Sequence, residues 1–131
     1  MTMSQQQWAR GPDGDKDATL ILIRHGETTW NADGRVQGHT NSPLNERGKQ
    51  QAQRVAQHLA KVKVQAIYSS DSTRAVETAN QVAAAHRLQV MASEELRERN
   101  YGVLEGKTLA EAARTQGTWF LSWQENRLNA P

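Results

Sequence analysis

A histidine and an arginine stand side by side directly after an apolar run early in the chain. The run and the pair read Leu-Ile-Leu-Ile-Arg24-His25-Gly26-Glu27 over residues 20–27. If the run is a buried strand of a parallel sheet, Arg24 and His25 lie at its carboxyl end, where α/β proteins bind ligands. A neutral imidazole is a nucleophile toward phosphorus, and a guanidinium offers paired donors to phosphate oxygens. The pattern indicates phosphoryl transfer. The alternatives are a turn whose charges face water and a histidine packed as a satisfied polar group.

The residues around this pair complete the first of three ordered motifs. The first motif spans residues 22–28 with Trp30-Asn31 after it. The second is Ser69-Ser70-Asp71 with Arg74-Ala75 and residues 77–79, and the third spans residues 95–99 with Tyr101-Gly102 and residues 104–106. Together the three motifs resemble the histidine phosphatase superfamily, the phosphoglycerate mutase-like group, and the resemblance covers about residues 18–110.

The resemblance implies roles for seven residues. His25 would accept the phosphoryl group, and Glu98 would protonate the leaving oxygen, as a carboxylic acid with a raised pKa can do. The residues expected to bind substrate phosphate are Arg24, Asn31, Gln37, Gly38 and Arg74. For the two arginines the alternative is surface ion pairing, and for Glu98 it is a solvated glutamate in a charged run.

Other titratable residues are expected to play smaller parts. Glu27 is expected to orient the loop by hydrogen bonds, and His39 to lie on the surface and at most border the substrate. His58 and His86 fall within predicted helices, where they face solvent or cap a helix end. No group of His, Asp and Glu has metal-ligand spacing, so we expect chemistry without a metal or other cofactor.

One part of the family pattern has no counterpart in this sequence. The resemblance implies a second active-site histidine in a late His-Gly motif, but His39, His58 and His86 are followed by Thr, Leu and Arg. The sequence therefore reads as the N-terminal two-thirds of a family member. A phosphate-binding fragment without catalytic activity stays open as an alternative to an enzyme.

The third motif favours a phosphatase over a mutase. Similar glycolytic mutases carry a lysine three residues after the last glycine of this motif, where Leu109 stands here; Lys107 comes two residues too early. Of the paired arginines that mutases carry further on, only Arg127 is present. We therefore expect hydrolysis of small phosphomonoesters through a phosphohistidine on His25, with mutase-type transfer as the alternative.

The composition excludes several other classes of function. The chain has 131 residues, 16 basic and 14 acidic side chains and no cysteine. The charges are interspersed, without the basic stripe that binds a nucleic-acid backbone. Without cysteine there are no disulfides or thiolate sites, and no apolar stretch has the length of a membrane span. A cytoplasmic enzyme without nucleic-acid or membrane partners is the expectation.

Alternating strand and helix patterns predict an α/β fold. Strands are expected over residues 18–23, 64–68 and 88–91, and helices from Glu46 onward, over residues 73–86 and over residues 109–114. An apolar helix edge is expected at Trp119, Phe120 and Trp123. A binding loop is expected over residues 28–43. We expect a three-layer sandwich whose mostly parallel sheet is flanked by helices and is incomplete at the C-terminus.

The domain organisation expected from these patterns is simple. Residues 1–17 are polar and predict a flexible leader. Residues 18–131 are expected to form a partial domain. The mean hydropathy of the whole chain is −0.79. An incomplete sheet leaves an unpaired strand edge, so we expect either weak stability or a homodimer made across that edge.

Overall fold

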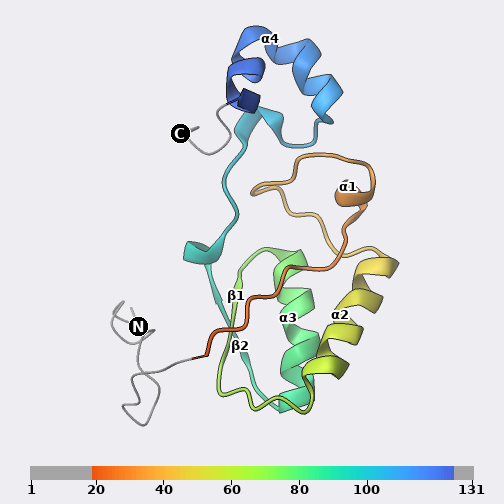
Figure 1. Cartoon of the computed structure of the whole chain (residues 1–131), viewed down its shortest axis with the longest axis vertical. Coiled ribbons are helices and arrows are strands. Elements are labelled where there is room, and N and C mark those ends of the chain that lie inside the picture. Colours follow the sequence, from red (N-terminus) through yellow and green to blue (C-terminus); the bar gives the residue numbers. More distant parts are fainter. Residues whose placement is uncertain (1–18, 126–131) are drawn as a thin grey trace.

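The computed structural model describes residues 19–125, and Figure 1 shows their elements. The helices are α1 (Thr29–Ala32), α2 (Glu46–Leu59), α3 (Thr73–His86) and α4 (Leu109–Glu125), and the strands are β1 (Ile67–Ser70) and β2 (Val90–Ser93). Two 3₁₀ turns, Glu94–Leu96 and Gly102–Leu104, lie between β2 and α4. The order β1-α3-β2 is a single β-α-β unit. Helices α1 and α2 precede it in the chain, and α4 follows it.

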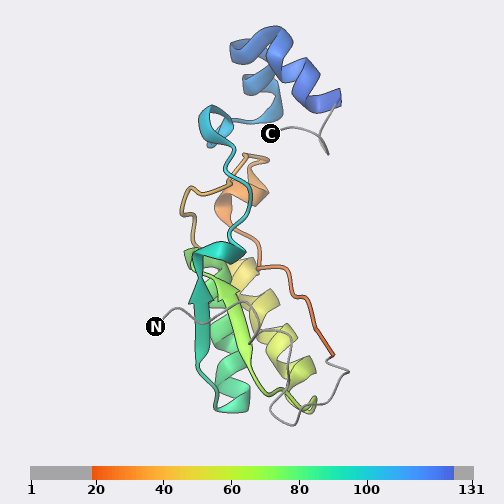
Figure 2. The ribbon, with the colours of Figure 1, turned by 90° about the vertical axis from the view of Figure 1, so that its left-hand side faces the viewer.

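The two strands form a parallel sheet with a helix layer against it. Ile67 is paired with Val90 and Ser70 with Ser93. Figure 2 shows α3 beside the strands and α2 beyond it. The predicted α/β fold with a parallel sheet and packed helices is thereby confirmed. The cross-strand partners Tyr68 and Met91 are exposed, so no helix covers that face within residues 19–125.

The two long helices follow the predicted pattern. The α2 helix begins after Asn45, whose side chain accepts a hydrogen bond from the Gly48 N–H, the usual role of an N-cap. Its buried residues Ala56 and Leu59 form a core cluster with Val82 of α3. The α3 helix has the predicted bounds, and it ends at Arg87 in the left-handed conformation.

A second small cluster lies near the start of α4. Leu104 and Ala112 are buried there, with Val36 and Tyr101 packed against them. Val36 lies in the loop between α1 and α2, and its N–H and C=O bond to the Lys107 C=O and the Gly106 N–H. This pairing attaches the loop of residues 33–45 to the segment before α4.

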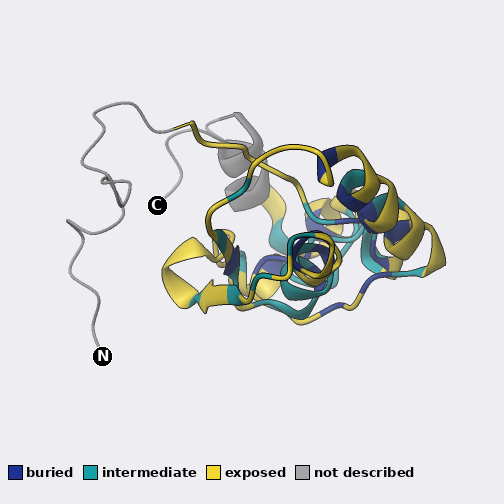
Figure 3. Cartoon of the chain, turned by 90° about the horizontal axis from the view of Figure 1, so that it is seen from below, coloured by how far each residue is buried: buried dark blue, intermediate teal, exposed yellow. Residues whose placement is uncertain are grey.

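The prediction of a strand over residues 18–23 was wrong for residues 19–23, the part that the structure describes. Residues 19–23 form no strand, and Leu20 and Leu22 are 79% and 86% exposed. In Figure 3 this stretch is coloured exposed where it leaves the grey N-terminal trace. A strand needs a hydrogen-bonded neighbour, and β1 and β2 pair only with each other. The apolar pattern therefore has no sheet position to fill within residues 19–125.

The remaining element predictions differ in their bounds or lie outside the described residues. Both strands begin two to three residues later than their apolar patterns, because the ladder is set by the register between them. The helix predicted over residues 109–114 continues to Glu125, with a non-helical Gly117 inside. The predicted leader and the side chains of Trp119, Phe120 and Trp123 lie outside the described part. None of the helices within residues 19–125 is long and apolar enough to cross a membrane.

Candidate active site

The turn that carries His25 is fixed through the backbone of Gly26. Its N–H donates to the Thr78 hydroxyl at 3.0 Å, and that hydroxyl donates to the Arg74 carbonyl on α3 at 2.8 Å. Both groups are buried, so each needs its partner. The turn is thus attached directly to the first turns of α3, the helix that supplies Arg74.

The same turn lies against the start of α2. A Cβ on Gly48 would overlap the Glu27 carbonyl, and a Cβ on Gly26 would overlap the Gly48 carbonyl. Glu27 fixes the turn further, because its Oε1 accepts a 3.0 Å hydrogen bond from Asn45 Nδ2 and its N–H donates to Gln51. The structural role predicted for Glu27 is confirmed.

This close approach makes Gly48→Ala a test of the packing. Alanine favours a helix over glycine by about 1 kcal/mol, so helix propensity alone predicts stabilisation. We expect instead a loss of about 1–3 kcal/mol in the free energy of unfolding, because backbone must move. Urea denaturation measures it, with the exposed Gln50→Ala on the same helix as control. A more stable Gly48→Ala chain would contradict the packing.

The His25 ring is held in one tautomer, whose unprotonated nitrogen faces Arg74. Nδ1 lies 2.7 Å from the Gly26 carbonyl oxygen, which only accepts, so Nδ1 carries the proton. Nε2 then presents its lone pair, and it accepts a 3.3 Å hydrogen bond from Arg74 Nε. Burial lowers the pKa of His25; the Gly26 hydrogen bond opposes this, and the charges of Arg74 and Arg24 add to the lowering. The neutral, nucleophilic form is therefore favoured.

Arg74 is the buried cation of the site, with only 3% of its surface exposed. Its Nη2 donates to the Gly38 carbonyl at 2.8 Å and its Nη1 to the Thr40 carbonyl at 3.1 Å. Burial lowers the pKa of this guanidinium, while the carboxylates of Glu98 and Glu105 raise it. The two carbonyls fix the guanidinium plane beside His25, so a phosphate on His25 Nε2 would meet a preset cation.

The other predicted phosphate ligands are placed less directly. Asn31 Oδ1 accepts from the Thr28 N–H and hydroxyl, which caps α1 and leaves its Nδ2 donor without a protein partner among residues 19–125. Gln37 is buried and accepts the Thr28 hydroxyl at 2.6 Å. Arg24 is exposed and makes no ion pair or hydrogen bond with the described residues, although its charge acts on His25.

The Gly38 carbonyl accepts a hydrogen bond from Arg74, and a residue with a side chain would not fit at this position. Its φ is +56°, and a Cβ there would overlap the Glu105 carboxylate. The loop of residues 37–40 therefore lies between Arg74 on one side and Glu105 on the other. A phosphate-binding role for Gln37 and Gly38 stays a prediction.

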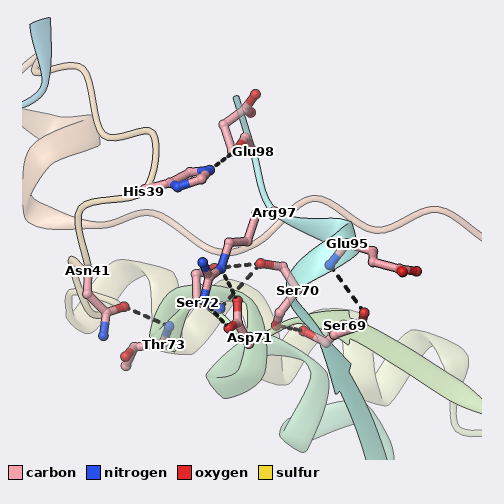
Figure 4. Close-up of polar contacts among 11 residues, drawn as sticks. His39, Asn41, Ser69, Ser70, Asp71, Ser72, Thr73, Glu95, Arg97 and Glu98 are labelled. Carbon is pink, nitrogen blue, oxygen red and sulfur yellow. Dashed lines mark hydrogen bonds and ion pairs between the residues drawn. The ribbon is translucent and has the colours of Figure 1, made fainter. Parts of the chain in front are cut away.

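Glu98 lies at the far side of a polar cavity from α3. The cavity has a volume of about 200 Å³, and its lining includes Arg74, Glu98, Arg97 and Asp71. In Figure 4 the Glu98 carboxylate points away from the Asp71–Arg97 ion pair, and Oε1 accepts from the Arg99 N–H at 2.8 Å. The role of Glu98 as acid requires its side chain to rotate toward a substrate in this cavity.

His39 and Glu105 hold the loop beside the cavity in place by hydrogen bonds. These contacts were not predicted from the sequence. His39 Nε2 lies 2.8 Å from the Glu98 carbonyl oxygen, as Figure 4 shows, so His39 connects the loop to the segment that carries the expected acid. Glu105 accepts several hydrogen bonds from the same loop. Glu105 stood in a recognised motif, but nothing in its spacing indicates contacts 65 residues away.

Comparisons with known proteins show the family to which the chain belongs. A model of the histidine phosphatase superfamily (branch 1) matches residues 20–131. Phosphoglycerate mutase-like protein 4 from Arabidopsis thaliana is 43% identical over 112 residues, which are 84% of this chain and 49% of that protein. The chain thus spans about half the length of the curated relatives it matches, less than the two-thirds expected.

Two solved structures show the same arrangement of elements. YhfR from Bacillus stearothermophilus has 43% sequence identity and a TM-score of 0.74, over 82% of this chain and 54% of that one. A mycobacterial glucosyl-3-phosphoglycerate phosphatase solved with VO3 has 34% identity and a TM-score of 0.74, over 82% and 51%. With its three motifs, its site geometry and these matches, the chain belongs to the histidine phosphatase superfamily, branch 1.

Proposed function

We propose that this chain transfers the phosphoryl group of a small phosphomonoester to His25 and then to water. The observation that carries the proposal is the His25–Arg74 contact. Nδ1 donates to the Gly26 carbonyl, so the unprotonated Nε2 faces the buried guanidinium and accepts a 3.3 Å hydrogen bond from Arg74 Nε. A nucleophile and the cation that stabilises charge on the phosphoryl oxygens are thus already adjacent.

The proposed reaction has two steps. First the Nε2–P bond forms and the P–O bond to the leaving alcohol breaks, while Glu98 gives its proton to the departing oxygen. Then water attacks phosphorus, the N–P bond breaks, and the Glu98 carboxylate takes the proton of that water. Arg74 stays beside the equatorial oxygens in both steps.

The relatives include both phosphatases and phosphoglycerate mutase-like proteins, so two acceptors are considered. Glucosyl-3-phosphoglycerate phosphatase was solved with VO3, an anion related to phosphate, whereas the plant relative is named for mutase likeness. Leu109 stands where the resemblance implies a mutase lysine. We therefore propose water as the acceptor, with transfer to a phosphoglycerate as the second candidate.

The two acceptors are separated by following the product. We expect the chain to release inorganic phosphate from small phosphomonoesters, detected by a colorimetric phosphate assay. With 3-phosphoglycerate as substrate, movement of phosphate to the neighbouring oxygen without release would support the mutase instead. Binding of inorganic phosphate without either product would support the fragment without catalytic activity.

The lowered pKa of His25 sets the acid side of the activity profile. Only the neutral imidazole attacks phosphorus, so kcat/KM falls as the pH drops through the pKa of the free enzyme. Because the pKa of His25 lies below its usual value of 6.5, we expect the midpoint of this fall to lie below pH 6.5. A profile of kcat/KM against pH measures it. A midpoint above 6.5 would contradict the geometry of the buried, cation-flanked ring.

A further inference from the structure

Glu105 accepts more hydrogen bonds than any role expected for it requires. Its Oε1 accepts from the backbone N–H groups of His39 at 2.9 Å and Tyr101 at 3.1 Å. Its Oε2 accepts from the Thr40 N–H at 3.0 Å and from the Thr40 hydroxyl. One carboxylate thereby holds the loop of residues 38–40 against the turn at Tyr101.

The loop that Glu105 holds is the one that orients Arg74. Gly38 and Thr40 offer their carbonyl oxygens to the two terminal nitrogens of the guanidinium. Glu105 binds the His39 N–H, which belongs to the same peptide group as the Gly38 carbonyl. Because that peptide group is planar, fixing its N–H also fixes the direction of the Gly38 carbonyl. Glu105 holds Thr40, the residue that offers the second carbonyl, through its N–H and its hydroxyl.

We propose that Glu105 is a positioning residue for phosphoryl transfer, which sets the Arg74 guanidinium beside His25 by holding the loop of residues 38–40. The proposal rests on the function proposed above, and it concerns how the same site is kept ready. Glu105 itself touches neither His25 nor the reacting atoms.

The contacts require a carboxylate at this position. Three backbone N–H groups and a hydroxyl converge on its two oxygens, so both oxygens must accept. A glutamine would direct its NH₂ group toward at least one of these donors and leave that N–H unpaired. Burial raises the pKa of Glu105, but the hydrogen bonds from Thr40, His39 and Tyr101 together hold it below its usual range. The carboxylate is therefore ionised at neutral pH.

The close packing of Gly38 supports the same interpretation. A side chain at Gly38 would overlap Glu105 Oε1, so the loop and the carboxylate are in direct contact. The negative charge also raises the pKa of Arg74, against the effect of burial. Glu105 therefore acts on Arg74 both through the loop and through its charge.

The first test observes Arg74 without any substrate. In arginine-¹⁵N-labelled full-length chain, we expect Arg74 Nε–H to give a shifted, slowly exchanging resonance, identified by its absence in Arg74→Lys. Glu105→Gln should move this resonance toward the position of solvent-exposed arginines, and Glu105→Asp, which keeps two acceptor oxygens, should restore part of the shift. An Arg74 resonance unchanged in Glu105→Gln would overturn the proposal.

A matched control separates positioning from a general loss of structure. Glu111 is also a carboxylate with a lowered pKa, and it accepts from Arg35 at 2.8 Å and from the Thr108 N–H at 2.9 Å. Its contacts lie at the start of α4 and do not involve Arg74. Glu111→Gln should therefore change stability while the Arg74 resonance and phosphate affinity keep their wild-type values. An equal change in Glu105→Gln and Glu111→Gln would assign Glu105 a merely structural role.

The second test measures coupling to Arg74 with inorganic phosphate as the probe. Glu105→Gln should weaken phosphate binding about ten- to hundredfold in the wild-type background. In an Arg74→Met background, which keeps the volume but removes the guanidinium, the same change should matter less than about twofold. The same factor in both backgrounds would overturn the proposal.

The two tests distinguish failure of this proposal from failure of the proposed function. If the wild-type chain releases no phosphate but Glu105→Gln still moves the Arg74 resonance, the proposed function fails and the positioning role stands. If the chain hydrolyses phosphomonoesters while Glu105→Gln leaves both the resonance and phosphate affinity unchanged, the positioning role is wrong.

Discussion

Replacing His25 with alanine is expected to abolish turnover of phosphomonoesters, with a loss in kcat of the order of 10⁴-fold or more. The change removes the only group that this account lets attack phosphorus, while Arg74 stays in place to bind phosphate. We therefore expect the dissociation constant for inorganic phosphate to change much less than kcat. Phosphate release under substrate saturation measures the first quantity, and isothermal titration with phosphate measures the second.

The exposed His58 on α2 provides the matched control for this experiment. His58→Ala should keep wild-type kcat and wild-type stability, because surface changes of this kind cost within about 0.5 kcal/mol. Wild-type turnover in His25→Ala would show that another group forms the intermediate, or that none is formed. Either finding would contradict the role of the Arg24-His25 turn.

Changes at Arg74 are expected to have the second-largest effect. Arg74→Lys keeps a positive charge but cannot donate to Gly38, Thr40 and His25 from one rigid plane. We expect kcat/KM to fall about ten- to hundredfold, since each hydrogen bond to a charged group contributes about 1.5–3 kcal/mol. Arg74→Met also removes the charge, so kcat/KM should fall further in this variant, and the affinity for phosphate should fall as well.

The pH profile distinguishes the electrostatic part of this effect. The Arg74 charge contributes to the lowered pKa of His25, although burial contributes more. In Arg74→Met the acid limb of kcat/KM should therefore move to higher pH than in Arg74→Lys. Arg24→Lys, on an exposed side chain, is the control that keeps charge next to the imidazole. An unmoved acid limb in Arg74→Met would show that Arg74 does not face His25 in solution.

The helices and the nucleophile were predictable from the sequence because their signals are local. The α3 helix has the bounds predicted from the sequence, and α2 begins at the predicted Glu46. His25 and Arg74 were both selected from motifs, and the structure brings them together at 3.3 Å. Their contact still required the fold, since 49 residues separate them.

The predictions that were wrong or missing depend on partners distant in sequence. The apolar run of residues 18–23 indicates a strand, but whether a ladder forms depends on a neighbour that residues 19–125 do not supply. Gly48 in the first turn of a helix looks unfavourable from the sequence alone, but a side chain at this position would overlap Glu27. The contacts of Glu105 could not be predicted for the same reason, because its hydrogen-bond donors lie on a loop about 65 residues earlier.

The most direct test of the central claim is to locate the phosphoryl group on the protein. The full chain is mixed with an excess of a small phosphomonoester, quenched in alkali within one turnover, and digested for mass spectrometry under conditions that preserve phosphohistidine. We expect one phosphoryl group on His25, absent from His25→Ala and retained in His58→Ala. Phosphate release without a label on His25, or a label on another residue, would contradict it.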